Sequence, residues 1–223
     1  MMRTRFVALA GAVAILALAG MAAAEVVGKT TGPLIGKTAR LAECSLGDLV
    51  ADAVRAQAGA EVALVPASQL RQRDLPAGDL TADALTDSLV SPDEQVAIVS
   101  MDGKTLRSAI EFALTMAPDK PNPAFLQVSG ISVTFRSDRP QNQRVGEVQV
   151  GASPLVAERQ YRVAMPASLA KGALGYFRLF DGLERKQTGG TLGAALVDYV
   201  AKQRTVTPQS GRLSDLAPPA QKQ

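Results

Sequence analysis

The carboxylates of this chain are scattered, apart from one pair spaced a single helical turn apart. Asp48 and Asp52 lie four residues apart in a segment with helical periodicity, so both side chains are expected on one face of a helix. The pair would need further oxygen ligands from elsewhere to hold Ca²⁺ or Mg²⁺. Like charges at this spacing are usually solvated. We therefore interpret the pair as a solvent-exposed face and expect no metal site.

The sequence contains no histidine, which limits the chemistry that the chain can perform. This absence excludes acid-base catalysis by histidine, serine-histidine nucleophiles and metal sites with histidine ligands. The chain also has no P-loop, Gly-x-Ser-x-Gly, His-Glu-x-x-His or Cys-x-x-Cys motif. We therefore expect no cofactor, no catalytic residue, and a chain that binds something without cleaving it alone.

Cys44 is the only cysteine of the chain, so no intramolecular disulfide can form, even in an oxidising compartment. A lone thiol beside an apolar helix usually packs as a small hydrophobic side chain. We expect Cys44 to be buried, and an intermolecular disulfide is the alternative.

Residues 1–24 have the features of a secretory signal peptide. Two arginines precede an apolar stretch, residues 6–20, and small residues lead to Ala24. This pattern predicts cleavage after Ala24 and a periplasmic or secreted mature chain that begins at Glu25. An uncleaved anchor is the alternative, because the apolar stretch is near the shortest length that spans a bilayer. After cleavage we expect no stable membrane anchor.

The mature chain has the size and charge of one ordinary domain. Removing two arginines with the signal peptide lowers the net charge from +3 to about +1. A nearly neutral chain without basic runs has no surface for nucleic acid, so we expect no nucleic-acid partner. We expect the domain to span residues 25–213, followed by a polar, proline-containing tail, 214–223, that is disordered.

Hydrophobic periodicity predicts helices interleaved with short strands. Gly59 is expected to end the first helix, and Asp102-Gly103 to begin the strongest one. Adjacent strands joined by short turns favour a mixed sheet, so we predict an α+β fold. The expected helices cover about 45–57, 81–89, 104–117 and 192–202, and the expected strands cover part of 26–37 and 63–65, 95–101, 126–128, 131–136, 145–150 and 161–165.

A series of short motifs resembles, in order, the C-terminal domain of the periplasmic 5'-nucleotidase and UDP-sugar hydrolase family. Together they extend over about residues 38–213, nearly the whole mature chain. The motifs are Glu43-Cys-Ser-Leu-Gly-Asp-Leu-Val-Ala-Asp52, Leu75-Pro-Ala-Gly-Asp-Leu-Thr81, Asp102-Gly-Lys-Thr-Leu106, Phe125-Leu-Gln-Val-Ser-Gly-Ile131, Tyr161-Arg-Val-Ala164, Gly172-Ala-Leu-Gly-Tyr176 and Gly211-Arg-Leu213.

The resemblance implies a division of labour. In that family the N-terminal domain holds two metal ions and hydrolyses the phosphoester, and the C-terminal domain supplies the pocket that grips the nucleotide. This chain resembles the second domain standing alone, without the metallophosphoesterase domain. The resemblance therefore implies a nucleotide or nucleoside ligand and a possible partner chain that carries the metals.

The pocket that the resemblance implies is only partly kept. A family loop of sequence Asn-Gly-Gly-x-x-Arg matches residues 66–71, where Arg71 is present but the amide and both glycines are not. Of two aromatic residues that stack on the base, one matches Tyr176, and the other falls on residues 91–94, which contain no ring. Arg40 matches a ligand-contacting arginine, and Asp181 lies near an acidic ligand contact. The implied ligand-binding residues are Arg40, Arg71, Tyr176 and Asp181.

Structural roles for the same residues stay open. Arg40 and Arg71 could pair with surface carboxylates, and Tyr176 could be a core ring with its hydroxyl in water. Ser129 is expected to be a turn residue.

Three functions remain from the sequence. The first is an exported, non-catalytic relative of the 5'-nucleotidase C-terminal domain that binds a nucleotide or nucleoside weakly or docks a separate catalytic domain. The second is the substrate-binding part of a phosphohydrolase assembled from two chains. The third is a protein-interaction domain whose inherited pocket has decayed.

Overall fold

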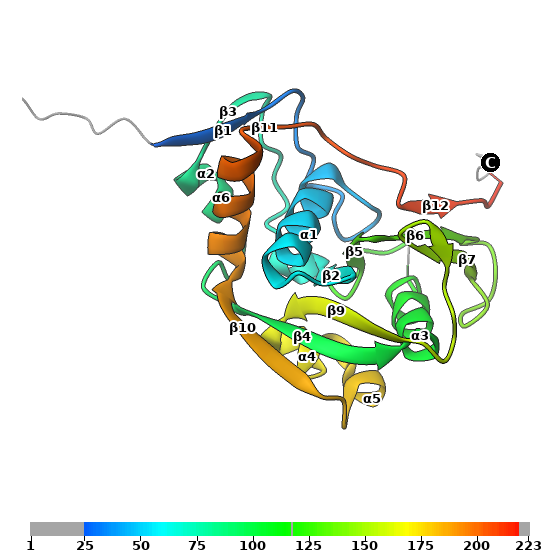
Figure 1. Ribbon diagram of the computed structural model, residues 1–223. Coiled ribbons are helices and arrows are strands. Elements are labelled where there is room, and N and C mark those ends of the chain that lie inside the picture. The colour runs from blue at the N-terminus through cyan, green and yellow to red at the C-terminus, as the bar shows by residue number, and fades with distance from the viewer. Residues whose placement is uncertain (1–24, 117, 219–223) are drawn as a thin grey trace, which may run out of the picture.

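The computed structural model describes residues 25–116 and 118–218; the expected signal peptide and the last five residues lie outside this part. A mixed five-stranded sheet forms its centre, with α1 packed on it (Figure 1). β2 and β9 run parallel, and the other neighbouring pairs are antiparallel. In order across the sheet, the strands are β10 (Arg185–Thr191), β4 (Gln95–Asp102), β9 (Gln160–Pro166), β2 (Val62–Pro66) and β5 (Leu126–Ser129).

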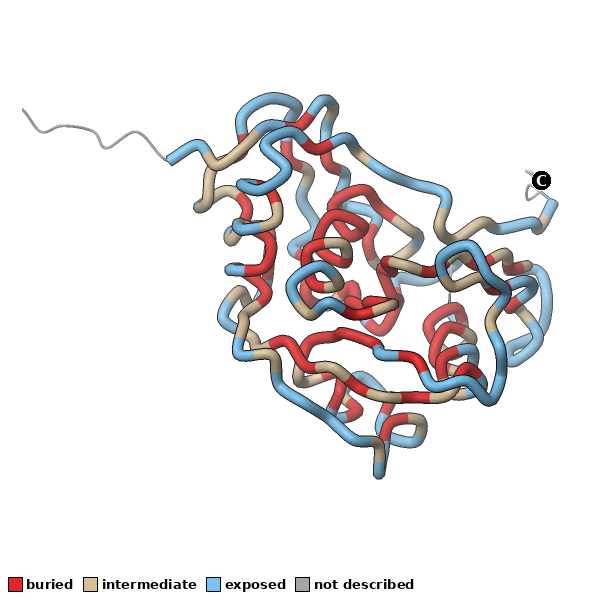
Figure 2. Tube along the Cα trace, viewed as in Figure 1, coloured by how far each residue is buried: buried red, intermediate tan, exposed pale blue. Residues whose placement is uncertain are grey.

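Nine of the 14 residues of helix α1 (Ser45–Ala58) are buried, and its trace is largely red in Figure 2. Its apolar residues recur at helical spacing and pack against β2, β5 and helix α6 (Leu192–Gln203). Gly59 ends it in the left-handed conformation, with φ of 57°, as glycine does at helix C-termini. The N-cap is Cys44, whereas the Ser45 hydroxyl accepts a hydrogen bond from the Ile35 backbone N–H.

Two smaller sheets flank the centre. One joins β11 (Thr205–Val206), β1 (Val26–Thr30) and β3 (Gly78–Thr81). The other joins β12 (Leu213–Asp215), β6 (Ile131–Phe135), β7 (Val145–Val150) and β8 (Ser153–Pro154). The remaining elements are the helices α2 (Ala82–Thr86), α3 (Gly103–Ala113), α4 (Ala167–Ala170) and α5 (Phe177–Phe180) and the 3-10 turns η1 (Ala67–Gln69) and η2 (Ala173–Gly175).

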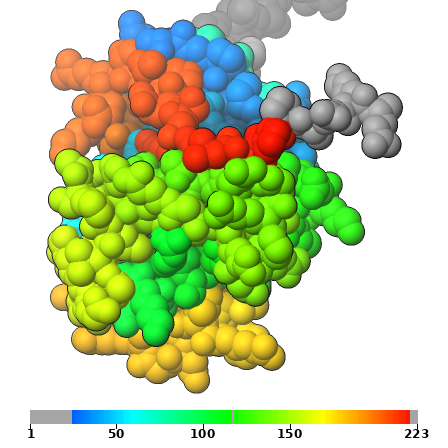
Figure 3. All heavy atoms as spheres, turned by 90° about the vertical axis from the view of Figure 1, so that its right-hand side faces the viewer, coloured from blue at the N-terminus to red at the C-terminus, as the bar shows by residue number. Residues whose placement is uncertain are grey.

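The segment that follows α6 ties these parts together. β11 pairs parallel with β1, and β12 pairs parallel with β6. Figure 3 shows this segment in red, lying between α6 and the N-terminal part on one side and the β6–β7 region on the other. Both ends of the described chain are therefore held in sheets.

The predicted α+β class is confirmed, and each predicted helix and strand has a counterpart. Asp102 caps α3 by accepting a hydrogen bond from the Thr105 N–H at 2.8 Å. The boundary of the expected disordered tail at residue 214 is wrong, because Ser214 and Asp215 pair with β6. No helix in the described part of the chain is long and apolar enough to cross a membrane.

Candidate functional site

The segment Asn122–Phe125 is the point where three of the predicted ligand-binding regions meet. The Asn122 N–H donates to the Arg40 carbonyl oxygen at 2.7 Å. The carbonyl oxygens of Pro123 and Phe125 accept hydrogen bonds from η1, two residues before Arg71. Tyr176 donates its hydroxyl hydrogen to the carbonyl oxygen of Ala124 at 2.8 Å. The fold therefore gathers Arg40, η1 and Tyr176 around one short segment.

Tyr176 is fully buried in this arrangement. Its ring lies edge-on to Phe112, with centroids 4.8 Å apart, and stacked on Phe180 at 5.4 Å. The core-ring alternative describes this position, but its hydroxyl is bonded to the protein and is not in water. The adjacent Phe177 has 56% of its surface exposed. A planar ligand could reach the Tyr176 ring only after the loop around it moved.

A carboxylate fills the space between the carboxyl ends of the parallel strands β2 and β9. Glu94 accepts a hydrogen bond from the Ser168 backbone N–H at 2.8 Å and another from the Gln69 amide. Crevices at the carboxyl ends of parallel strands are common ligand sites. Here Glu94 engages the side-chain amide nitrogen of Gln69 and the backbone N–H of Ser168.

The other predicted residues make fewer contacts. Arg71 is exposed and donates from Nε to the Leu89 carbonyl oxygen at 3.0 Å. Buried Nε of Arg40 has no hydrogen-bond partner among the described residues. Asp181 is exposed at the end of α5. Neither arginine pairs with a carboxylate in the described part of the chain.

A second cluster of polar side chains lies along α1. The expectation that Asp48 and Asp52 form a solvated face is wrong. Asp48 is completely buried, and the Asp52 side chain is 17% exposed. Arg212 donates from Nη2 to Asp52 Oδ2 at 2.8 Å and lies 3.8 Å from Asp48 Oδ1. The backbone N–H groups of Arg212 and Leu213 donate to the two carboxylate oxygens of Glu43, both at 2.9 Å. One arginine from the C-terminal segment thus faces three carboxylates.

Burial raises the pKa of Asp48 to about 9, and the negative charge of Glu43 acts in the same direction, against Arg212. Neither Asp48 oxygen receives a hydrogen bond within the described residues. A proton on Asp48 turns the contact with the Glu43 carboxylate into a hydrogen bond. Asp48 is therefore neutral at pH 7, and Asp52 is the carboxylate that the Arg212 guanidinium contacts at 2.8 Å.

Asp52 is also connected to a second arginine through the hydroxyl of Ser129. Ser129, at the buried end of β5, donates its hydroxyl hydrogen to Asp52 and accepts a hydrogen bond from Arg55 Nε at 2.7 Å. Ser129 therefore connects Asp52 to Arg55, which its interpretation as a turn residue missed. The contact joins residues 77 positions apart, so no local pattern reveals it.

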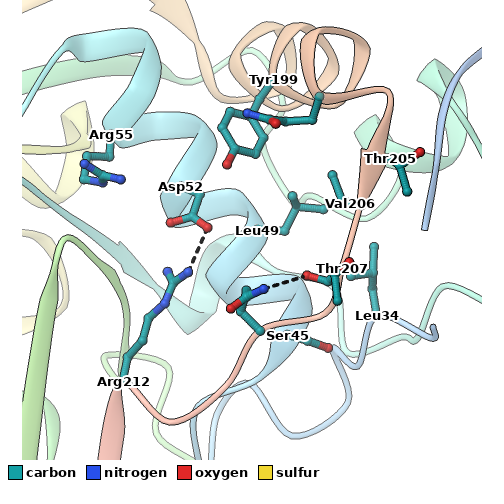
Figure 4. Close-up of a pocket in the computed structure, with 12 residues that line it drawn as sticks. Leu34, Ser45, Leu49, Asp52, Arg55, Tyr199, Thr205, Val206, Thr207 and Arg212 are labelled. Atoms are coloured by element: carbon teal, nitrogen blue, oxygen red, sulfur yellow. Dashed lines mark hydrogen bonds and ion pairs between the residues drawn. The ribbon is translucent and has the colours of Figure 1, made fainter. Parts of the chain in front are cut away.

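This network forms one wall of a cavity of about 440 Å³ between α1, α6 and the segment that contains β11 (Figure 4). Arg55, Asp52 and Arg212 lie along one side, and the Tyr199 ring projects from α6 opposite them. The complete lining is Leu34, Ser45, Leu49, Asp52, Arg55, Tyr199, Gln203, Thr205, Val206, Thr207, Gln209 and Arg212. None of the four ligand-binding residues predicted from the sequence lines it.

Cys44 is buried, and its sulfur takes part in no disulfide. Burial raises the pKa of its thiol to about 12. The expectation of a small buried hydrophobic residue is confirmed.

The family model of the 5'-nucleotidase C-terminal domain matches residues 26–182. The chain belongs to this family. A solved relative, the 5'-nucleotidase precursor from Thermus thermophilus, superposes with a TM-score of 0.80 at 27% identity. That match covers 87% of this chain and 40% of the relative.

Two relatives of known sequence show the same partial coverage. A 5'-nucleotidase-related protein of Glossina morsitans morsitans is 30% identical over 213 residues, which are 85% of this chain and 38% of that protein. An apyrase of Anopheles gambiae is 31% identical over 192 residues, 82% of this chain and 33% of that protein. The chain thus spans well under half the length of these relatives.

Proposed function

We propose that this chain is an exported, non-catalytic domain that binds a nucleoside or nucleotide weakly. The observation that supports this proposal is the convergence of Arg40, η1 and Tyr176 on the segment Asn122–Phe125. The family resemblance assigns ligand contacts to these regions, and their hydrogen bonds to one short segment bring them together.

Weak ligand affinity is expected from the groups around Glu94. The Glu94 carboxylate carries a negative charge and already uses the Ser168 N–H and the Gln69 amide. A phosphate must overcome this charge and replace these hydrogen bonds before it binds. The buried ring of Tyr176 must also be uncovered before a base stacks on it. We expect millimolar to high-micromolar dissociation constants, on the order of 4 to 6 kcal/mol.

We assign the remaining ligand contacts to Arg40, Arg71 and Asp181. Arg40 Nε has no partner within the described residues, and a guanidinium suits a phosphate or another anionic group. Arg71 and Asp181 are exposed and would hold polar groups of the ligand. The chain has no histidine, so hydrolysis would require a second chain with the metal ligands.

The alternative function is that this domain binds substrate for a phosphohydrolase assembled from two chains. An exposed apolar pair beside Tyr176 favours it: Leu174 and Phe177 are 37% and 56% exposed. Leu174 also has φ of 61°, a strained conformation for a non-glycine residue. The loop is thus held with two apolar side chains directed outward.

Glu94→Gln tests the ligand-binding proposal. The variant removes the negative charge but keeps the length of the side chain and an oxygen for the Ser168 N–H. Calorimetry with AMP should give an affinity about 3- to 10-fold higher than that of the unchanged protein, because one repulsive contact is lost. Adenosine, which carries no phosphate, should gain less.

Glu158→Gln is the matched control. Glu158 is exposed in the turn before β9, and its replacement should leave both affinities unchanged. If neither AMP nor adenosine binds to the unchanged protein or to Glu94→Gln, the ligand-binding proposal is wrong and a protein-interaction role replaces it.

A further inference from the structure

We propose that the cavity between α1, α6 and residues 205–212 is a second ligand site, which binds a small organic anion with several hydroxyl groups, of the sugar phosphate class. Its lining contains none of Arg40, Arg71, Tyr176 and Asp181. The proposal is therefore independent of the nucleotide site proposed around Glu94.

The charges around the cavity favour an anion. Arg55 and Arg212 contribute two positive charges, and Asp52 is the only acidic residue among the lining residues. Asp52 is already engaged by Ser129 and Arg212. The lining therefore has a net positive charge, which attracts a ligand with one negative group.

The fixed position of Arg55 makes it the anion-binding group. Its Nε donates to Ser129 at 2.7 Å, which orients the guanidinium. Its two terminal nitrogens have no partner within the described part of the chain and are free to bind two oxygens of a phosphate or carboxylate. Arg212, in contrast, uses its terminal nitrogens on Asp52 and on the Val128 carbonyl oxygen. The anionic group is thus assigned to Arg55.

Tyr199 supplies a hydroxyl on the opposite side of the cavity. Its ring projects into the cavity opposite Asp52 (Figure 4), and its hydroxyl has no partner among the described residues. Burial and the charge of Asp52 raise the pKa of Tyr199, so the hydroxyl stays protonated and is a donor. A protonated tyrosine hydroxyl can donate a hydrogen bond to an oxygen of the ligand.

The far side of the cavity is neutral and polar. The side chains of Gln203 and Thr205 have no hydrogen-bond partner within residues 25–116 and 118–218, and both line the cavity. Amides and hydroxyls both donate and accept, as hydroxyl groups of a ligand require. Leu34, Leu49 and Val206 form an apolar part of the lining, which suits the carbon face of a sugar ring. A volume of about 440 Å³ lies within the range of small-molecule sites.

Calorimetry on the full mature chain with ribose 5-phosphate, inorganic phosphate and ribose tests the proposal. Ribose 5-phosphate should bind at least fivefold tighter than either fragment. Arg55→Gln should weaken its binding at least tenfold, because a charge-assisted contact is lost. Tyr199→Phe keeps the ring and should weaken it about 3- to 10-fold, the effect of one neutral hydrogen bond.

Arg178→Gln is the matched control, since Arg178 is an exposed arginine that lines a different cavity, with Phe112 and Leu179. It should leave the affinity unchanged. The proposal is overturned if ribose 5-phosphate does not bind, or if Arg55→Gln and Tyr199→Phe bind it like the unchanged protein. Equal affinity for inorganic phosphate and ribose 5-phosphate would overturn the assignment of a sugar ligand.

Discussion

Replacing Asp48 with asparagine is expected to stabilise the protein at neutral pH. Asp48 is buried, and its pKa in the folded protein is about 9, against 3.8 for an unperturbed aspartate. The folded state therefore holds a proton that the unfolded chain releases above pH 4. Since the folded pKa is the higher one, the protonated carboxyl supports the fold fully below about pH 4, and this support is lost as pH rises towards 9.

The size of the effect follows from the same two values. Each pKa unit between the unfolded pKa and the working pH corresponds to about 1.4 kcal/mol. At pH 7 the difference is about three units, so keeping Asp48 neutral costs about 4 kcal/mol. Asparagine is neutral at every pH, can donate to Glu43 and fills nearly the same volume. We expect Asp48→Asn to raise the free energy of unfolding by about 2 to 4 kcal/mol at pH 7. The range extends below the full cost because the folded protein can relax around a charged Asp48 side chain.

Urea denaturation at several pH values measures this difference. The gap between Asp48→Asn and the unchanged protein should be near zero at pH 4 and should widen steadily up to pH 8. Asp79→Asn is the matched control, since Asp79 is exposed on β3 and should shift stability equally little at every pH. A variant that is destabilised at pH 7, or a gap that does not change with pH, would refute the argument that Asp48 is protonated.

Four further outcomes are expected. Arg212→Ala should lower the free energy of unfolding by about 1 to 3 kcal/mol, because it leaves the partly buried Asp52 carboxylate without its guanidinium partner, and hydrogen exchange should show loss of protection in β12 before other strands. The Cys44 thiol should not react with a disulfide reagent at pH 8 until urea unfolds the chain, since its pKa of about 12 keeps it protonated; rapid labelling of the native protein would contradict this. Purified protein with Mn²⁺, Zn²⁺ or Mg²⁺ should release no phosphate from AMP or UDP-glucose above a buffer blank, and metal-dependent turnover that copurifies with the chain would show that the non-catalytic proposal is wrong. Intact mass of protein from the periplasm should correspond to a chain beginning at Glu25, whereas a membrane-bound species retaining residues 1–24 would support the anchor.

Elements defined by local patterns could be predicted from the sequence. The apolar spacing of α1, its stop at Gly59 and the Asp102 cap of α3 all depend on residues within one or two turns. β10 could not be predicted, because its sequence is polar and glycine-containing and its strand conformation comes from pairing with β4. β12 likewise has no apolar pattern and depends on β6.

The sites were less predictable for the same reason. Asp48 looked like a solvated residue because its partner Arg212 is 164 positions away. The arrangement of Glu94, Gln69 and Ser168 also depends on three distant segments. The resemblance to the family located the regions around Asn122–Phe125, but the burial of Tyr176 arises from the packing of Phe112 and Phe180, which periodicity does not specify.

The pairing of β1 with β11 has a consequence for how the chain is made. Thr31 and Thr207, which flank this pairing, are 176 positions apart, and Arg212 must reach α1 before its carboxylates are neutralised. β1 can pair with β3 earlier, but its second edge is completed only by β11, and contacts of such long range slow folding. Such a delay would suit a protein that crosses a membrane as an extended polypeptide and folds on the other side.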